Sequence, residues 1–160
     1  MKSARIAVVA LVVAITMNGC TLQGDFRLDE RLQIMAPGDR QTVTLPLRVR
    51  WRFDNESEAA RFGVFIDRAP VRVGENIDAL ARNDRDCTSR PGCPDESWFQ
   101  AQGVFVTTKA GLRIDTLGIP FDARGARELH QLTIVILDAQ ARRVGETAAS
   151  VEFFFEREQI

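Results

Sequence analysis

Short runs of alternating hydrophobic and polar residues dominate the chain from Leu32 onward, and a period of two is typical of half-buried β-strands. The clearest run is residues 45–53, LPLRVRWRF. Its apolar side chains fall on one face, and Arg48, Arg50 and Arg52 fall on the other. Residues 129–138, LHQLTIVILD, are almost continuously apolar, which predicts a central strand buried on both faces.

Proline, glycine and acidic residues separate further runs of this kind. We expect the corresponding strands at residues 32–37, 61–67, 98–107, 111–117 and 148–156. Residues 70–80 favour an edge strand or a turn-rich connection, because they contain Pro70 and Gly74. Residues 83–95 favour a polar loop. The pattern gives seven or eight strands and no helix of ten or more residues after the N-terminal segment. It predicts an all-β protein, an antiparallel β-sandwich or a barrel.

The first 20 residues carry a different signal. Lys2 and Arg5 precede an uncharged and almost wholly apolar segment, residues 6–17. This segment fits the apolar region of a signal peptide and is too short for the roughly 20 residues that span a bilayer. A small residue, Gly19, then leads directly to Cys20. We therefore expect the chain to be exported.

This segment resembles the signal peptides of bacterial lipoproteins, which have an apolar residue three positions before a cysteine and a small residue directly before it. Met17 and Gly19 occupy these positions. The resemblance implies cleavage before Cys20, diacylglycerol on its thiol and often a further acyl chain on its amino group; two or three acyl chains anchor a protein almost permanently. Thr21 stands where an aspartate retains enterobacterial lipoproteins at the inner membrane, which favours the outer membrane. An ordinary cleaved signal and an uncleaved anchor are the alternatives.

Cleavage there would divide the precursor into three parts: a signal peptide at residues 1–19, a lipidated tether at residues 20–31 and one domain at residues 32–160. Of the 160 residues, 19 would leave and 141 would remain. The mature chain would keep 19 of the 21 basic residues and all 22 acidic ones. Its net charge near −3 argues against nucleic acid as a partner.

Cys87 and Cys93 lie in DCTSRPGCPD, on either side of the turn-forming pair Pro91 and Gly92. An exported protein enters an oxidising compartment, so this spacing predicts a local disulfide. Closing so short a loop would stabilise the fold by roughly 2 kcal/mol. Free thiols and a zinc site are the alternatives, although a zinc site would lack further cysteine ligands and the single histidine, His130, is distant in sequence.

Over residues 32–156 the strand pattern resembles that of immunoglobulin-like and fibronectin type III-like sandwiches. Residues 45–51 are similar to a second strand that carries the buried core tryptophan, here Trp51, and residues 129–156 are similar to the closing hairpin. The resemblance implies an immunoglobulin-like sandwich. The chain has no tyrosine, so the tyrosine corner common in these folds is missing.

No catalytic motif stands out: GxSxG, HExxH and glycine-rich phosphate loops are absent from the sequence. His130 enters an apolar strand, and the sequence identifies no partner that would make it a catalytic base. We therefore predict neither an enzyme nor a cofactor or metal requirement. Residues 83–96 gather several oxygen-bearing side chains, which favours a solvated acidic loop and leaves a calcium site as the alternative.

The row formed by Arg48, Arg50 and Arg52 is the other candidate site. At a rise of about 3.3 Å per residue, neighbouring guanidinium groups in the row would lie roughly 7 Å apart. Such a row could bind anionic envelope polymers or lipid head groups. Alternatively, the arginines could pair with acids such as Asp115 on a neighbouring strand.

Together these observations predict a membrane-anchored lipoprotein of the cell envelope whose sandwich serves a binding or structural role. Its expected partners are the membrane, through the lipid anchor, and an envelope protein or glycan. The alternative is an accessory lipoprotein that binds a small ligand or calcium.

Overall fold

The structure is a computed structural model that describes residues 31–54, 61–117 and 127–156. The predicted signal peptide, Cys20 and the tether up to residue 30 lie outside these ranges. Among the described residues, no helix has both the length and the apolar character needed to cross a membrane.

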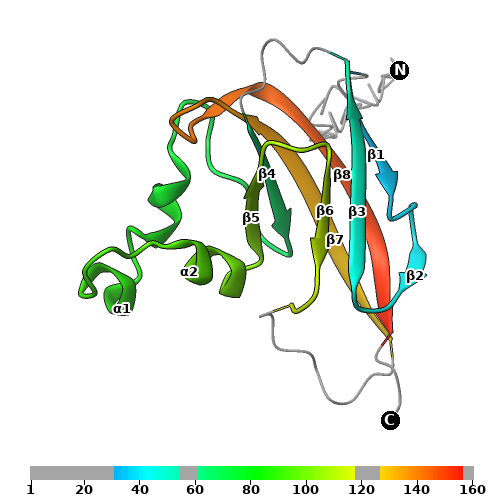
Figure 1. The fold of residues 1–160 in the computed structure, drawn as a ribbon, viewed down its shortest axis with the longest axis horizontal. Helices are drawn as coiled ribbons and strands as arrows, with labels where there is room; N and C mark the ends of the chain where they lie inside the picture. The colour runs from blue at the N-terminus through cyan, green and yellow to red at the C-terminus, as the bar shows by residue number, and fades with distance from the viewer. Residues whose placement is uncertain (1–30, 55–60, 118–126, 157–160) are drawn as a thin grey trace, which may run out of the picture.

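Within the described ranges, eight strands form two sheets (Figure 1). They are β1 (Leu32–Ala36), β2 (Gln41–Val43), β3 (Leu47–Phe53), β4 (Arg61–Ile66), β5 (Val104–Thr107), β6 (Gly111–Ile114), β7 (Arg127–Leu137) and β8 (Arg143–Glu156). The smaller sheet has the order β1-β3-β6, and the larger sheet has the order β2-β8-β7-β4-β5. The predicted all-β sandwich is confirmed.

Strand β2 corrects the prediction that all strands pair antiparallel. It lies parallel to β8, with Thr42 opposite Phe154. The chain leaves the smaller sheet after β1, bends at Pro37 and Gly38, and joins the edge of the larger sheet at β2. The sequence pattern missed this strand because three residues are too few to show an alternation.

The main core lies between the two sheets and follows the predicted alternation. On β3, Leu47, Val49, Trp51 and Phe53 are all buried, whereas the residues between them are exposed. The Trp51 ring meets Phe62 of β4 edge-on, with ring centroids 5.3 Å apart. Strand β7 lies between β8 and β4. The prediction of a central strand buried on both faces is confirmed for Leu132 to Leu137, whereas Leu129 and Gln131 before them are exposed.

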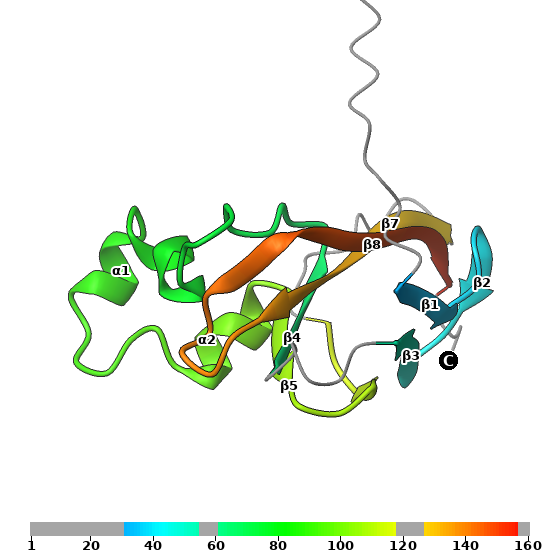
Figure 2. The ribbon, with the colours of Figure 1, turned by 90° about the horizontal axis from the view of Figure 1, so that it is seen from above.

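The chain between β4 and β5, residues 67–103, forms a helical cap on the other face of the larger sheet. It contains the 3-10 helix η1 (Ile77–Ala81) and the helices α1 (Arg85–Thr88) and α2 (Glu96–Ala101). Figures 1 and 2 both place α1 and α2 at the end of the molecule opposite β1 and β3. Apolar residues of the cap and of the sheet form a second core cluster, which includes Phe65, Trp98, Phe99, Val135 and Leu137.

The cap corrects two sequence predictions. The strand expected at residues 98–107 begins only at Val104, because the preceding residues form α2. Trp98 and Phe99 are consecutive and both buried, an arrangement that a half-buried strand does not allow. The loop expected at residues 83–95 contains α1, and residues 70–80 form the turn-rich connection rather than an edge strand.

Backbone hydrogen bonds attach the cap to the hairpin between β7 and β8. The amide of Gly74 donates to the carbonyl of Arg143 over 2.8 Å, and the amide of Arg143 donates to the carbonyl of Glu75 over 2.9 Å. The Arg143 side chain also donates from Nη1 to the carbonyl of Val71 over 2.9 Å. Burial lowers the pKa of this guanidinium.

Candidate functional site

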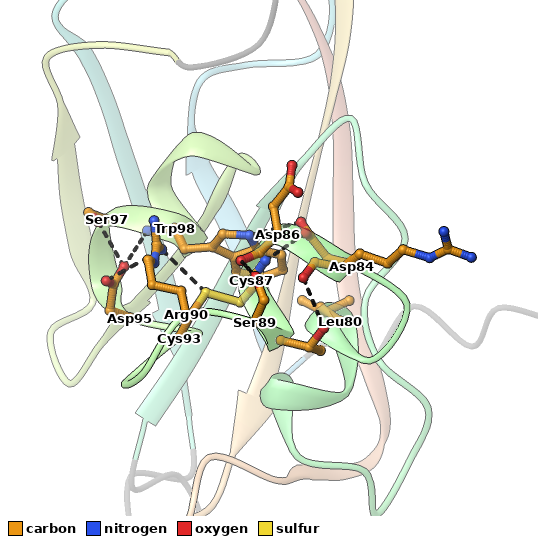
Figure 3. The surroundings of a disulfide bond; sticks show 12 residues. Leu80, Asp84, Asp86, Cys87, Ser89, Arg90, Cys93, Asp95, Ser97 and Trp98 are labelled. Atoms are coloured by element: carbon orange, nitrogen blue, oxygen red, sulfur yellow. Dashed lines mark hydrogen bonds and ion pairs between the residues drawn. A yellow bond between two sulfur atoms is a disulfide. The ribbon is translucent and has the colours of Figure 1, made fainter.

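Cys87 and Cys93 form the predicted disulfide, with their Cα atoms 5.2 Å apart (Figure 3). Cys87 belongs to α1 and is buried in the second core cluster, whereas Cys93 is half-buried. Arg90 donates from Nη2 to Sγ of Cys93 over 3.3 Å. The disulfide therefore ties the outermost turn of the cap to its apolar interior.

Two carboxylates of the acidic loop start the helices of the cap (Figure 3). Asp84 accepts the amide hydrogen of Cys87 over 2.9 Å and the indole hydrogen of Trp98 over 3.1 Å, and these two hydrogen bonds lower the pKa of Asp84. Asp95 accepts from the hydroxyl of Ser97 over 2.7 Å and from the amide of Trp98 over 2.8 Å, which lowers the pKa of Asp95. Both carboxylates thus have structural partners in the cap.

The calcium alternative gains no support from this geometry. Within residues 31–54, 61–117 and 127–156, no three His, Cys, Asp or Glu side chains come together in a way that could hold a metal ion.

His130 is buried at the start of β7 and has a carboxylate partner that lies 63 residues away in sequence. Its Nδ1 lies 2.5 Å from Oδ2 of Asp67, whose Oδ1 accepts the amide hydrogen of Gln131 over 2.8 Å. The His130 ring also stacks on Phe153, with centroids 5.6 Å apart. These contacts join the end of β4 to β7, which is a structural role.

The three arginines of β3 are exposed on the outer face of the smaller sheet, as predicted. Across the sheet, Arg113 of β6 lies directly opposite Arg48. We call Arg48, Arg50, Arg52 and Arg113 the arginine face. Like charges directly opposite each other on a sheet are destabilising, so the position of Arg113 beside Arg48 does not stabilise the sheet.

Among the described residues, ion pairs account for two of the four arginines of this face. Arg52 pairs with Asp54 over 3.0 Å, and Arg113 pairs with Asp115 over 2.8 Å. Asp115, which directly follows β6, therefore pairs with an arginine of β6 rather than with β3. In the described part of the chain, no carboxylate forms an ion pair with Arg48 or Arg50.

Beside Arg48 and Arg50 lies a groove of about 440 Å³. β1 pairs with β3 only as far as Arg50, and the chain then turns away toward β2. The groove lies along the part of β3 that β1 no longer covers. Pro37 and Thr44 are among the residues that form its other walls. Guanidinium groups stay protonated and donate hydrogen bonds to both oxygens of a phosphate or carboxylate. The arrangement is suited to holding an anion rather than to breaking a bond.

Comparison of the chain with protein-family models, with curated proteins and with solved structures finds no match. Sequence reasoning identified three members of the arginine face but missed Arg113 and the groove. The alternation in residues 111–114 places Arg113 on an outer face, but only the strand register places it opposite Arg48.

Proposed function

We propose that the chain is a lipoprotein held at the outer membrane through Cys20, and that its β-sandwich binds anionic head groups of the membrane surface with the arginine face. The observation that carries this proposal is the pair of exposed guanidinium groups, Arg48 and Arg50, that have no carboxylate partner among the described residues. A binding or structural role needs no catalytic groups, which fits a candidate site made of arginines.

The position of the tether supports the same proposal. Residues 20–31 would reach about 40 Å when fully extended, so the domain would stay close to the bilayer. The tether would join the fold at β1, and β1 neighbours β3 in the smaller sheet. Leu32, the first residue of β1, lies opposite Phe53, next to the Arg52 end of the arginine face. The anchor and the arginine face would thus belong to one side of the molecule.

For the fold we propose an immunoglobulin-like arrangement. The order β1-β3-β6 matches strands A, B and E of such domains, and the order β8-β7-β4-β5 matches strands G, F, C and C′. The helical cap would then be an insertion between strands C and C′. The outer face of the smaller sheet would remain open for binding.

Vesicle sedimentation tests the binding role. The mature chain carrying Cys20→Ser, which has no lipid of its own, should bind phosphatidylglycerol vesicles, should bind phosphatidylcholine vesicles much less, and should dissociate as salt is raised. Replacing Arg48, Arg50 and Arg52 with serine should weaken binding roughly a hundredfold, since each basic group near an anionic surface contributes about 1 kcal/mol.

A matched control removes the same charge from the cap, with serine at Arg72, Arg82 and Arg85, all of which are exposed. This control should weaken binding by less than about tenfold. Equal losses in the two triple variants would contradict a defined binding face. Binding to phosphatidylcholine as strong as to phosphatidylglycerol would contradict the electrostatic basis.

The anchor is tested separately, by growth with labelled palmitate. The wild-type chain should incorporate label, and a Cys20→Ala variant should not. Label that persists in the variant would exclude Cys20 as the attachment site.

A further inference from the structure

The groove beside the arginine face is a built feature of the fold. One wall is β3, which contributes Arg48 and Arg50. The opposite walls are Ala36 at the end of β1, the following Pro37, and the connection from β2 to β3, which contributes Thr44. The bend after β1 and the connection from β2 to β3 thus both lie along the same side of β3.

Hydrogen bonds hold the bend between β1 and β2 on both sides. The amide of Gly38 donates to Oε1 of Gln41 over 2.8 Å, and the amide of Gln41 donates to the carbonyl of Gly38 over 3.1 Å. The amide of Arg40 donates to the carbonyl of Glu152 on β8 over 2.7 Å. The parallel pairing of β2 with β8 then fixes the far side. The wall opposite the arginines is therefore held in place before any ligand arrives.

Among the described residues that line the groove, two are cations and none is an acid. Thr44 adds a hydroxyl group, and the remaining lining is largely aliphatic, with Pro37, Val43 and Pro46 among it. Its volume of about 440 Å³ falls within the range of small-molecule sites, which is roughly 300–1,000 Å³. This lining suits a ligand that carries negative charge at one end and has a compact, partly polar body at the other.

We infer that the groove binds a phosphorylated sugar, with the phosphate held by Arg48 and Arg50 and the sugar ring lying against the proline-lined wall. Arginine pairs well with phosphate oxygens, since its planar fork donates two hydrogen bonds in parallel. The hydroxyl of Thr44 can exchange hydrogen bonds with sugar hydroxyls, while proline and valine contact the apolar edge of the ring. The inference rests on the proposed function, because it assigns a head-group chemistry to the same face. The sugar phosphate could come from a membrane glycolipid or from solution.

The test is an amide chemical-shift titration of the mature Cys20→Ser chain. Glucose 1-phosphate should shift the amides of the groove, and glucose should not. Inorganic phosphate should bind at least about tenfold more weakly, because the ring contacts are missing. Phosphate binding as tightly as glucose 1-phosphate would overturn the assignment of a sugar.

Three variants separate this site from the arginine face as a whole. Thr44→Trp fills the groove and changes no charge, and Thr44 is exposed outside the strands. It should abolish the glucose 1-phosphate shifts and leave binding to phosphatidylglycerol vesicles intact. Replacing Arg48 and Arg50 with serine should abolish the shifts, whereas replacing Arg52 and Arg113, which removes equal charge, should weaken them less than about threefold.

The outcomes distinguish the inference from the proposed function. If glucose 1-phosphate shifts no groove amide while anionic vesicles still bind, the sugar-phosphate site is wrong and the proposed function stands. If neither binds, both are wrong. Vesicles that display a phosphorylated glycolipid, compared with phosphatidylglycerol vesicles, then identify the source: tighter binding that Thr44→Trp removes indicates a membrane glycolipid, and no difference indicates a soluble ligand.

Discussion

Removing the disulfide should open the helical cap and leave the sandwich closed. The variant replaces Cys87 and Cys93 with alanine together, so that no free thiol remains. The two residues are six apart in sequence, and loop-closure entropy for so short a loop amounts to about 2 kcal/mol. Cys87 is only 2% exposed, so losing its sulfur adds about 1 kcal/mol of lost apolar burial. The free energy of opening the cap should therefore fall by about 3 kcal/mol.

The two core clusters determine where this loss appears. Cys87 packs in the cluster of the cap, while the cluster between the sheets includes Val49 and Phe153 and no residue of the cap. Hydrogen exchange followed by mass spectrometry should show amides of residues 77–101 exchanging roughly a hundredfold faster. Amides of β3 should keep their protection. Urea unfolding of the same variant should show a loss no larger than about 3 kcal/mol.

A control variant with alanine at Thr88 and Ser89 changes the same helix through two exposed side chains and leaves the disulfide intact. It should exchange nearly as the wild-type chain does. Faster exchange in β3 equal to that in the cap would show that the two clusters unfold as one unit. An unchanged cap would show that the disulfide adds nothing to the folded state.

Three further predictions concern other sites. Gly63→Ala should lower the unfolding free energy in urea by roughly 1–3 kcal/mol, because a β-carbon there would lie 2.9 Å from a ring carbon of Phe65. Unchanged stability would show that the sheet can shift to make room. Folding lowers the pKa of Asp84 and Asp95 below the value of 3.8 that these carboxyl groups have in the unfolded chain. The stability that they add is therefore complete above pH 3.8 and is lost as the pH falls through their lowered pKa values in the folded state. Thermal melts should show that loss, and a variant with asparagine at both positions should show a smaller one. Asp67→Ala should lower the unfolding free energy in urea by roughly 1–3 kcal/mol, because His130 and the amide of Gln131 lose their acceptor. Asp67→Asn keeps an oxygen and tolerates the positive φ of 53° at this position, so it should lower the unfolding free energy less. Equal losses in the two variants would contradict this role.

The sequence predicted those parts of the fold in which one face of a strand is buried. Leu47, Val49, Trp51 and Phe53 were placed correctly on one face of β3, because the period of two directly reflects the alternation of side chains. The same alternation placed Arg48 and Arg50 outward. Periodicity carries no information about which strands are neighbours, so Arg113 was not assigned to the same face.

The helical cap was the part that sequence reasoning described least well. Its helices have six residues or fewer, and so short a segment completes too few turns to show a helical period. The usable signals were local: Asp84 and Asp95 are good N-cap residues, and each stands directly before a helix. The pair of Asp67 and His130 left no local signal, since 63 residues separate them.

The crossing of the chain from the smaller sheet at β1 to the larger sheet at β2 has a mechanical consequence. A pull that reaches Leu32 from the N-terminal side loads the hydrogen bonds between β1 and β3 first. Only after β1 detaches does the load pass through the bend at Pro37 to the pairing of β2 with β8. The two attachments act in series, so the pairing of β1 with β3 yields before the pairing of β2 with β8 is loaded.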